Sequence, residues 1–569
     1  MGASIVLACA AVLSAHAQSL PFPLSPSAGD ASTLTLRSGA LDTLARSDTA
    51  LVGPISLPGG GEVHLELRAV LDPFRATDVY VDGVRTERRL GDGSSLWRAS
   101  VLGAGEDSGE SGYFAFSRHG SRGWLRRGDE LYHLMAEPGP GGDWGASRSR
   151  WRTERELRSA GAAPSAVCGN DELPAWPAPA AASLSAGGRG ELHAGSLALL
   201  ECEIAIETDY QYFDLFDDLD AAEAYLAALL GAASDRYAQQ IGVVLTAPYV
   251  GFYTTADDPW LTPDAGGCFD VLYEFQGIWG YGGAAPVAAD LYHFVSGASL
   301  GCGVAWVGSL CDPFFAFAVS GNIHGGTPFP VEVSTLNWDF IVFTHEIGHN
   351  FSAPHTHDWC PEPVDACPPS EYWGYCQTEQ VCSGEGTLMS YCHLCDGGYV
   401  NHTTFFHPLS VSQMRFYAEY TGCVTPFDGG LVQTMPSCTV NAGTLQHAGG
   451  EPVLGGVLDL EVDDGQAPGV TVFLPFSFQP ADGWPPCGQE LPGLGELLLG
   501  IAPPNPAVIF GGGSTWGGAT PVEFHLVIPP DPTLQGSTLY SQALFADLAG
   551  VAPGEPFRLT GGLSFLIGA

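Results

Sequence analysis

The stretch FTHEIGHNFSAPH, residues 343–355, carries three histidines and one glutamate in a pattern that suits a metal site. His345 and His349 are four residues apart, so on a helix both imidazoles share a face and can reach one ion. Glu346 lies beside them and can polarise a metal-bound water as a general base. Because Pro354 stops the helix, the chain can turn and offer His355 as a third ligand. Three protein ligands leave the fourth position of zinc open, as catalytic zinc sites require.

Other interpretations of this stretch stay open. Two histidines on an ordinary surface helix would show the same short pattern by chance. His357 is a rival to His355 as the third ligand, although the spacing favours His355. Asp358 is either an anchor behind the ligands or merely a surface acid.

The extended pattern HExxHxxxxxH, with GTLMSYCH at 386–393, resembles the metzincin clan of zinc endopeptidases. The chain is most similar to the bacterial secreted form of the reprolysin-like (M12B-type) proteases, over about 196–425. The matching stretches are GVAWVGSLC, NWDFIVFTHEIGHNFSAPHTHDWC and GTLMSYCHLCDGGYVNHTTFFHP. The resemblance implies a tight turn in which Met389 lies beneath the metal. It also implies that Tyr391, placed as in astacins and serralysins, neighbours the zinc and stabilises the oxyanion. Both side chains could instead be ordinary core residues.

Two departures from the family pattern concern the turn after the helix. The clan usually has Gly where Ser352 stands, because the helix ends there with a left-handed residue. A residue with a Cβ in that conformation costs roughly 1–2 kcal/mol, so we expect a strained turn that keeps its ligands. Reprolysins carry Asp directly after the third His, whereas Thr356 follows here and Asp358 comes two residues later.

Cys168, in AVCGND, resembles the cysteine switch of metalloprotease zymogens, in which a thiolate fills the open position of zinc. The alternative is a disulfide. Cysteine parity favours that alternative: of 15 cysteines, Cys9 lies in a leader, and setting Cys168 aside leaves an odd number. Eight cysteines lie between Cys302 and Cys395, so we expect disulfides around the opening motif, and Cys438 could pair with Cys487.

The first seventeen residues, MGASIVLACAAVLSAHA, are typical of a signal peptide that ends in an A-x-A cleavage site. They predict a secreted protein, and the absence of a later run of 18 apolar residues predicts no membrane-spanning helix. The net charge of −42 argues against nucleic acid and anionic membranes as partners. Residues 1–189 carry a net charge of −3 and residues 190–569 one of −39. An arginine-bearing front part could therefore dock on an acidic remainder, unless the two parts simply differ in composition.

Patterning predicts a multidomain chain. After the signal peptide (1–17) we expect a β-rich pro-domain (18–171), a Pro/Ala/Gly/Ser-rich linker (172–195) containing Arg189, an α/β metzincin domain (196–426) with a mixed sheet and helices, and a C-terminal β-sandwich accessory domain (427–569). Within the α/β domain we expect strands at 197–213, 241–253 and in GVAWVGSL. Helices are expected from Asp218 to about Gln240, over 269–279, and from Asn337 into His349.

These observations predict a secreted zinc endopeptidase of protein or peptide substrates, made as a zymogen. His345, His349 and His355 would hold one Zn²⁺, and Glu346 would act as the base on a zinc-activated water. An extended substrate would add to the strand near 303–308 as an antiparallel strand. The many acids make Ca²⁺ sites possible, although no EF-hand spacing occurs. The alternatives are a catalytically inactive binding or adhesion protein on a protease scaffold and a structural zinc protein.

Overall fold

The computed structural model describes residues 20–568, apart from gaps of up to five residues and the stretches 103–109, 161–166, 169–198, 464–469, 482–487, 501–507 and 548–556. The predicted signal peptide, the linker with Arg189, and Cys9, Cys438 and Cys487 lie outside the described residues. Below, the described parts of 20–168, 199–427 and 430–568 are called the front, middle and C-terminal segments.

The front segment consists mainly of one antiparallel sheet, as the alternating sequence pattern predicts. Its order among the described strands is β1-β2-β11-β10-β9-β8-β7-β4-β3. The strands are β1 (Leu24–Ser27), β2 (Asp30–Leu36), β3 (Thr49–Leu57), β4 (Gly61–Ala69), β7 (Ser94–Val101), β8 (Ser111–Ser117), β9 (Arg122–Arg127), β10 (Glu130–Glu137) and β11 (Arg148–Thr153). Its helices are α2 (Ala40–Leu44), α3 (Glu154–Ala160) and the 3-10 turn η2 (Trp144–Ala146).

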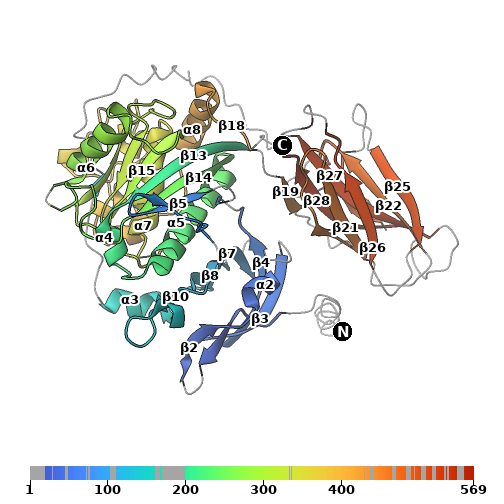
Figure 1. Cartoon of the computed structure of the whole chain (residues 1–569). Coiled ribbons are helices and arrows are strands. Elements are labelled where there is room, and N and C mark those ends of the chain that lie inside the picture. Colours follow the sequence, from blue (N-terminus) through green and yellow to red (C-terminus); the bar gives the residue numbers. More distant parts are fainter. Residues whose placement is uncertain are drawn as a thin grey trace.

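The middle segment is built on a mixed sheet with the order β12-β16-β17-β15-β13-β14-β5-β6, in which β18 also pairs with β13. Its own strands are β13 (Leu200–Thr208), β14 (Val243–Phe252), β15 (Leu291–Val295), β16 (Cys302–Ala305), β17 (Phe317–Ser320) and β18 (Thr425–Pro426). The other strands, β5 (Asp78–Val81), β6 (Val84–Arg85) and β12 (Val167–Cys168), come from the front segment. The predicted boundary at 171 therefore does not separate the sheets, because front strands lie at both ends of this one. Figure 1 shows one of them, β5, beside β14.

Helices surround this sheet. They are α4 (Tyr210–Asp214), α5 (Leu219–Gln240), α6 (Cys268–Phe275) with a π-helical continuation (Gln276–Tyr281), α7 (Trp338–Asn350) and α8 (Pro408–Thr421). Short 3-10 turns follow the opening motif: η5 (Thr356–Asp358), η6 (Ser370–Tyr372), η7 (Cys392–Leu394) and η8 (Gly398–Asn401). The middle segment is thus the mixed α/β structure that the alternating pattern predicts.

Three local expectations need correction. The strand expected over 197–213 ends at Thr208, because the Asp209 carboxylate accepts a hydrogen bond from the amide of Tyr212 and starts helix α4. The strand expected in GVAWVGSL ends at Ala305. Asn337 does precede α7, but its side chain bonds to Val331 rather than capping the helix.

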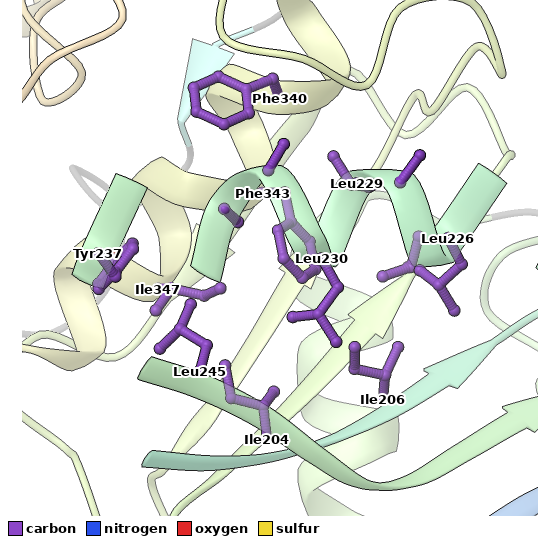
Figure 2. Close-up of a cluster of buried hydrophobic side chains, with 14 of the residues drawn as sticks. Ile204, Ile206, Leu226, Leu229, Leu230, Tyr237, Leu245, Phe340, Phe343 and Ile347 are labelled. Carbon is purple, nitrogen blue, oxygen red and sulfur yellow. The ribbon is translucent and has the colours of Figure 1, made fainter. Parts of the chain in front are cut away.

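The core of the middle segment lies between α5, α7 and the sheet. Figure 2 shows Leu226, Leu229, Leu230 and Tyr237 of α5 facing side chains of α7 and of the strands beneath. Helix α7 is buried along its whole length, and α5 from Ala221 to Tyr237. A helix that is buried on all sides needs neighbours on every face, so α7 can hold polar groups only where the fold supplies partners for them.

The C-terminal segment has a five-stranded antiparallel sheet, β19-β28-β27-β22-β25, and a three-stranded one, β20-β21-β26, within its described residues. Both sheets contribute to one hydrophobic cluster. The strands are β19 (Leu431–Met435), β20 (Thr444–Gly449), β21 (Val457–Asp463), β22 (Thr471–Ser477), β25 (Val508–Thr515), β26 (Val522–Val527), β27 (Thr538–Ala546) and β28 (Phe557–Leu566), with a separate hairpin of β23 (Gln489–Leu491) and β24 (Gly495–Leu497).

Candidate metal and catalytic site

Helix α7 presents His345 and His349 on one buried face. The Nδ1 atom of His345 lies 2.6 Å from the carbonyl oxygen of Leu388, and that of His349 lies 2.8 Å from the carbonyl oxygen of Ala353. Each carbonyl accepts a hydrogen bond from the Nδ1–H, which leaves the Nε2 lone pair unprotonated. Burial, with His355 and His345 nearby, lowers the pKa of His349 well below its usual value. Both imidazoles can therefore bind a metal ion through the lone pair of Nε2.

The Nε2 atom of His355 meets those of the two helix histidines. Nε2 of His349 lies 3.0 Å from Nε2 of His345 and 3.2 Å from Nε2 of His355. Ligands held 2.0–2.1 Å from a tetrahedral zinc are about 3.4 Å apart, so three nitrogens at this spacing fit one zinc ion. All three side chains are at most 4% exposed. The donor set of three imidazoles also suits zinc.

The turn that returns the chain towards the helix histidines, and so places His355 beside them, runs through Ser352. Ser352 has φ of +73°, the left-handed conformation expected at this position. The amide of Ser352 donates to the carbonyl of His349 at 2.8 Å, and the amide of Ala353 donates to that of Gly348 at 3.0 Å. These bonds end the helix, so the turn forms with serine in place of glycine.

The residues after the turn show how His355 is oriented. Its Nδ1 lies 3.4 Å from Oδ2 of Asp358. His357 stacks on the His355 ring, with centroids 5.0 Å apart, and does not belong to the group formed by the other three histidines. Of the two alternatives for the third position, the geometry favours His355, and Asp358 lies where an anchor would.

Met389 lies under α7 in the turn that the sequence pattern predicts. It is fully buried, and a Cβ at Gly348 would approach its sulfur to 2.8 Å. Its carbonyl oxygen accepts hydrogen bonds from the amide of Thr356 at 3.0 Å and from the hydroxyl at 3.2 Å. The carbonyl of Leu388 bonds to His345 on the helix, and the carbonyl of Met389 bonds to Thr356, next to His355. This turn therefore connects the helix histidines to the third histidine.

Tyr391 packs directly on the third histidine. The centroids of the Tyr391 and His355 rings are 4.5 Å apart, and Tyr391 is fully buried. Its hydroxyl donates a hydrogen bond of 2.7 Å to the carbonyl oxygen of Cys168. The hydroxyl therefore reaches the segment that lies over the histidine group.

Glu346 lies beside the histidines and is 1% exposed. Burial raises the pKa of its carboxyl to about 8, although a hydrogen bond from Cys168 partly opposes this. Strand β16 passes close above it, because a Cβ at Gly303 would come within 2.5 Å of a Glu346 oxygen. Gly303 thus permits the carboxylate to lie under the strand. Sequence analysis missed this role, although a glycine inside a strand is a known signal of close approach.

Cys168 reaches the histidine group from the front segment. Its sulfur lies 3.4 Å from Nε2 of His349 and 3.6 Å from Oε2 of Glu346. The donor atoms of Cys168, His345, His349 and His355 all lie within 4.8 Å of one another, and the four residues are buried. The backbone of Cys168 belongs to β12, which pairs in parallel with β16 so that Cys168 lies opposite Gly303.

The disulfides answer the parity argument against Cys168. Five disulfides join described cysteines: Cys268–Cys302, Cys311–Cys423, Cys360–Cys376, Cys367–Cys392 and Cys382–Cys395. All eight cysteines between Cys302 and Cys395 are among them, as expected. Cys168 and Cys202, both buried, belong to none. The odd count therefore disappears, because Cys202 of β13 is a second thiol.

Comparison with known proteins identifies the middle segment. Residues 199–405 match the family model Reprolysin_5, described as metallo-peptidase family M12. This match confirms the resemblance to reprolysin-like metallopeptidases that was found in the sequence. The match contains helix α7, all three histidines and the Met389 turn.

Two solved structures share weaker likenesses with the chain. Metalloproteinase-II from Bacteroides fragilis has 12% sequence identity and a TM-score of 0.32, over 57% of this chain and 90% of that one. A chaperone–substrate complex has 11% identity and a TM-score of 0.25, over 65% of this chain and 56% of that one. At these TM-scores neither likeness bears on the function. No curated protein matches the chain. Among the described helices, none has the length and apolar character needed to cross a membrane.

Proposed function

We propose that the chain is a secreted zinc-dependent endopeptidase that is made as a zymogen. The observation that carries this proposal is the convergence of three Nε2 atoms, on His345, His349 and His355, beside the buried carboxylate of Glu346. The M12 metallopeptidase family of residues 199–405 supports the same reaction class. The disulfides support an oxidising, extracellular compartment.

In this mechanism His345, His349 and His355 hold the metal, and the carbonyls of Leu388 and Ala353 keep two of the imidazoles in the correct orientation. A zinc ion bound there would supply a Lewis acid that acidifies water and polarises the scissile carbonyl. Glu346 accepts the proton of the attacking water and delivers it to the leaving amine. Its burial suits this task, because a raised pKa lets one carboxyl act first as base and then as acid.

The substrate would lie along the edge of β16 that β12 covers in the intact chain. An extended peptide there gains main-chain hydrogen bonds from the strand, and Gly303 keeps that edge close to Glu346. We propose the antiparallel direction for a substrate. In the intact chain β12 occupies this edge in the parallel direction. The Tyr391 hydroxyl, which here binds the Cys168 carbonyl, would turn to the oxyanion of the substrate once β12 has left.

The zymogen part of the proposal is carried by Cys168. Its sulfur, 3.4 Å from Nε2 of His349, lies where it can fill the fourth position of a three-histidine zinc site. Residues 18–171 would then be the pro-domain, 172–195 the linker that is cut, and 196–426 the catalytic domain. Residues 427–569 would be a β-sandwich accessory domain, since its two described sheets share one hydrophobic cluster. A Ca²⁺ site remains a prediction.

The test compares the processed chain, residues 190–569, with its Glu346→Ala variant on a mixture of unstructured peptides, with the zinc content of both measured. We expect cleavage by the parent and a loss of cleavage in a variant that still holds zinc. A parent that binds zinc and cleaves nothing would contradict the endopeptidase function and favour a binding protein on a protease scaffold. A parent that cleaves without zinc would contradict the metal mechanism.

A further inference from the structure

The front segment adds strands to both ends of the sheet of the metallopeptidase domain. Strand β12 lies on β16 beside the histidine group, whereas the hairpin β5–β6 lies on β14 at the other end. Figure 1 shows β5 in blue among the green strands of the domain. A cysteine that blocks the metal accounts for the first contact only.

The hairpin extends the sheet by regular strand pairing. Strand β5 runs parallel to β14, with Asp78 opposite Tyr249 and Val81 opposite Phe252. The Asp82 carboxylate accepts hydrogen bonds of 2.8 Å from both the amide and the hydroxyl of Thr254. These contacts cover an edge of β14 that would otherwise expose unpaired amide and carbonyl groups.

Helix α5 has an acidic face with a small residue at its centre. Two arginines of the front segment contact this face, Arg88 just after the hairpin and Arg98 on β7. Glu223, Ala227, Gly231 and Asp235 follow one another at intervals of four, so they share one helix face. Arg88 donates to both oxygens of Glu223, at 2.6 and 3.1 Å, and also pairs with Asp220. Nη2 of Arg98, on β7, lies 3.0 Å from Oδ1 of Asp235.

Gly231 shows that this face of α5 is shaped for a partner. A Cβ at position 231 would lie 2.1 Å from Cδ1 of Leu96 in the front segment. Glycine inside a helix is unfavourable compared with alanine, so its presence needs a packing reason. The close approach of Leu96 supplies that reason, since α5 has no other crowded neighbour at this position within the described residues.

A third arginine enters between aromatic rings near the start of α5. The guanidinium carbon of Arg122, 3% exposed, lies 5.1 Å from the ring centroid of Tyr225 and 5.8 Å from that of Phe216. Trp144 of the front segment covers the same guanidinium at 5.4 Å and donates its indole N–H to the Phe216 carbonyl at 2.9 Å. A desolvated cation over aromatic faces is a specific contact, and it also lies outside the histidine group.

We propose that the β14 edge and the acidic face of α5 form one docking surface, which binds a β-hairpin together with the arginines that follow it, Arg88 and Arg98, and that its occupant is the front segment of this same chain. This surface holds the front segment independently of Cys168, so cutting the linker alone does not release it. This proposal depends on the proposed function in one respect: it assumes that the linker is cut.

The test follows release of the front segment rather than peptide cleavage. In the full chain, a recognition sequence for a site-specific protease is inserted beside Arg189, and Glu346→Ala prevents any self-digestion. After cutting and dilution, size-exclusion chromatography at successive times gives the rate at which the two pieces separate. We expect Arg88→Ala with Arg98→Ala to raise this rate at least tenfold, and Cys168→Ser to leave the pieces together.

The matched control is Arg68→Ala with Arg155→Ala, which removes the same charge from pairs inside the front segment, with Glu66 and Glu130. We expect no change in the rate. Equal release by the control pair and the Arg88/Arg98 pair would overturn the proposal, as would complete release by Cys168→Ser alone. Because activity is not measured, either result leaves the endopeptidase proposal to its own test.

Two further variants guard against a folding defect. Asp235→Arg should speed release, and adding Arg98→Asp should restore slow release by reversing the pair, which a misfolded protein cannot do. Gly231→Met should also speed release while leaving the helix intact, since methionine favours helix more than glycine does. Failure of the charge reversal to restore docking, or slow release by Gly231→Met, would contradict the proposed surface.

Discussion

The Tyr391 hydroxyl donates a hydrogen bond of 2.7 Å to the carbonyl oxygen of Cys168. The same cysteine directs its sulfur at Nε2 of His349, 3.4 Å away. One residue of the front segment therefore engages two groups of the proposed active site. Its carbonyl binds the hydroxyl proposed to stabilise the oxyanion, and its sulfur faces the proposed metal position. Latency and catalysis would therefore use the same two groups, the Tyr391 hydroxyl and the metal position, in turn.

Replacing Cys168 with serine should weaken latency, although β12 would still lie along the edge of β16. Serine is a poorer zinc ligand than a thiolate, so the uncut Cys168→Ser chain should cleave a quenched fluorescent peptide at least about tenfold faster than the uncut parent. Cys202→Ala is the control, because Cys202 is a buried thiol of β13 outside the site. Equal rates for parent and Cys168→Ser, each with zinc bound, would show that Cys168 is no switch.

Tyr391→Phe should lower turnover in the processed chain. Removing one oxyanion donor costs about 10²-fold in kcat, and the ring that packs on His355 remains. We expect KM and zinc content to stay unchanged, so steady-state kinetics separate this role from a structural one. A fall in zinc content without a fall in kcat per bound zinc would make Tyr391 a core residue.

Ser352→Gly should stabilise the metallopeptidase domain without changing its activity. The left-handed φ of +73° costs serine roughly 1–2 kcal/mol that glycine does not incur. A gain of about 1 kcal/mol corresponds to a rise of about 2–4 °C in Tm for a domain of this size. Both Ser352→Gly and Ser352→Ala lose the hydrogen bond from Gln413, but only Ser352→Ala keeps the backbone strain, so the alanine variant should give no rise. A higher Tm for the alanine variant would contradict the strain argument.

Glu154 should make the chain less stable in acid. Burial would raise the pKa of its carboxyl, but hydrogen bonds from His133, Ser334 and Arg158 lower it to about 2. A carboxyl with a depressed pKa stabilises the fold above its unfolded value of about 4.5, and that stabilisation is lost as the pH falls towards 2. It amounts to at most about 3 kcal/mol.

Glu154→Gln tests this dependence, because glutamine keeps the shape and does not titrate. Between pH 4.5 and 2 the free energy of unfolding should fall less steeply with pH in the variant than in the parent. Glu156, an exposed acid on the same helix, supplies the control variant Glu156→Gln. Parallel pH curves for parent and Glu154→Gln would contradict the prediction.

Local patterns were sufficient for the elements that carry the site. The i, i+4 spacing of His345 and His349 required only helix geometry, and Pro354 required only that the helix stop. The start of α5 after Asp218 also follows from its sequence, since the Asp218 carboxylate accepts the amide of Ala221 at 2.9 Å. Strand ends were harder to predict. Residues 209–213 leave the strand because the Asp209 carboxylate, and not a neighbouring strand, accepts the amide of Tyr212.

The sequence by itself determined the helix of the candidate metal site, its three candidate ligands, the turn at Ser352 and the β-rich character of both flanking parts. Only the tertiary structure decided that Cys168 meets His349 across 181 positions of chain, and that β5 completes the sheet of another segment. The physical reason is range. Helix periodicity and turn conformations are set by neighbouring residues, whereas strand pairing and packing between distant segments depend on the whole set of competing contacts.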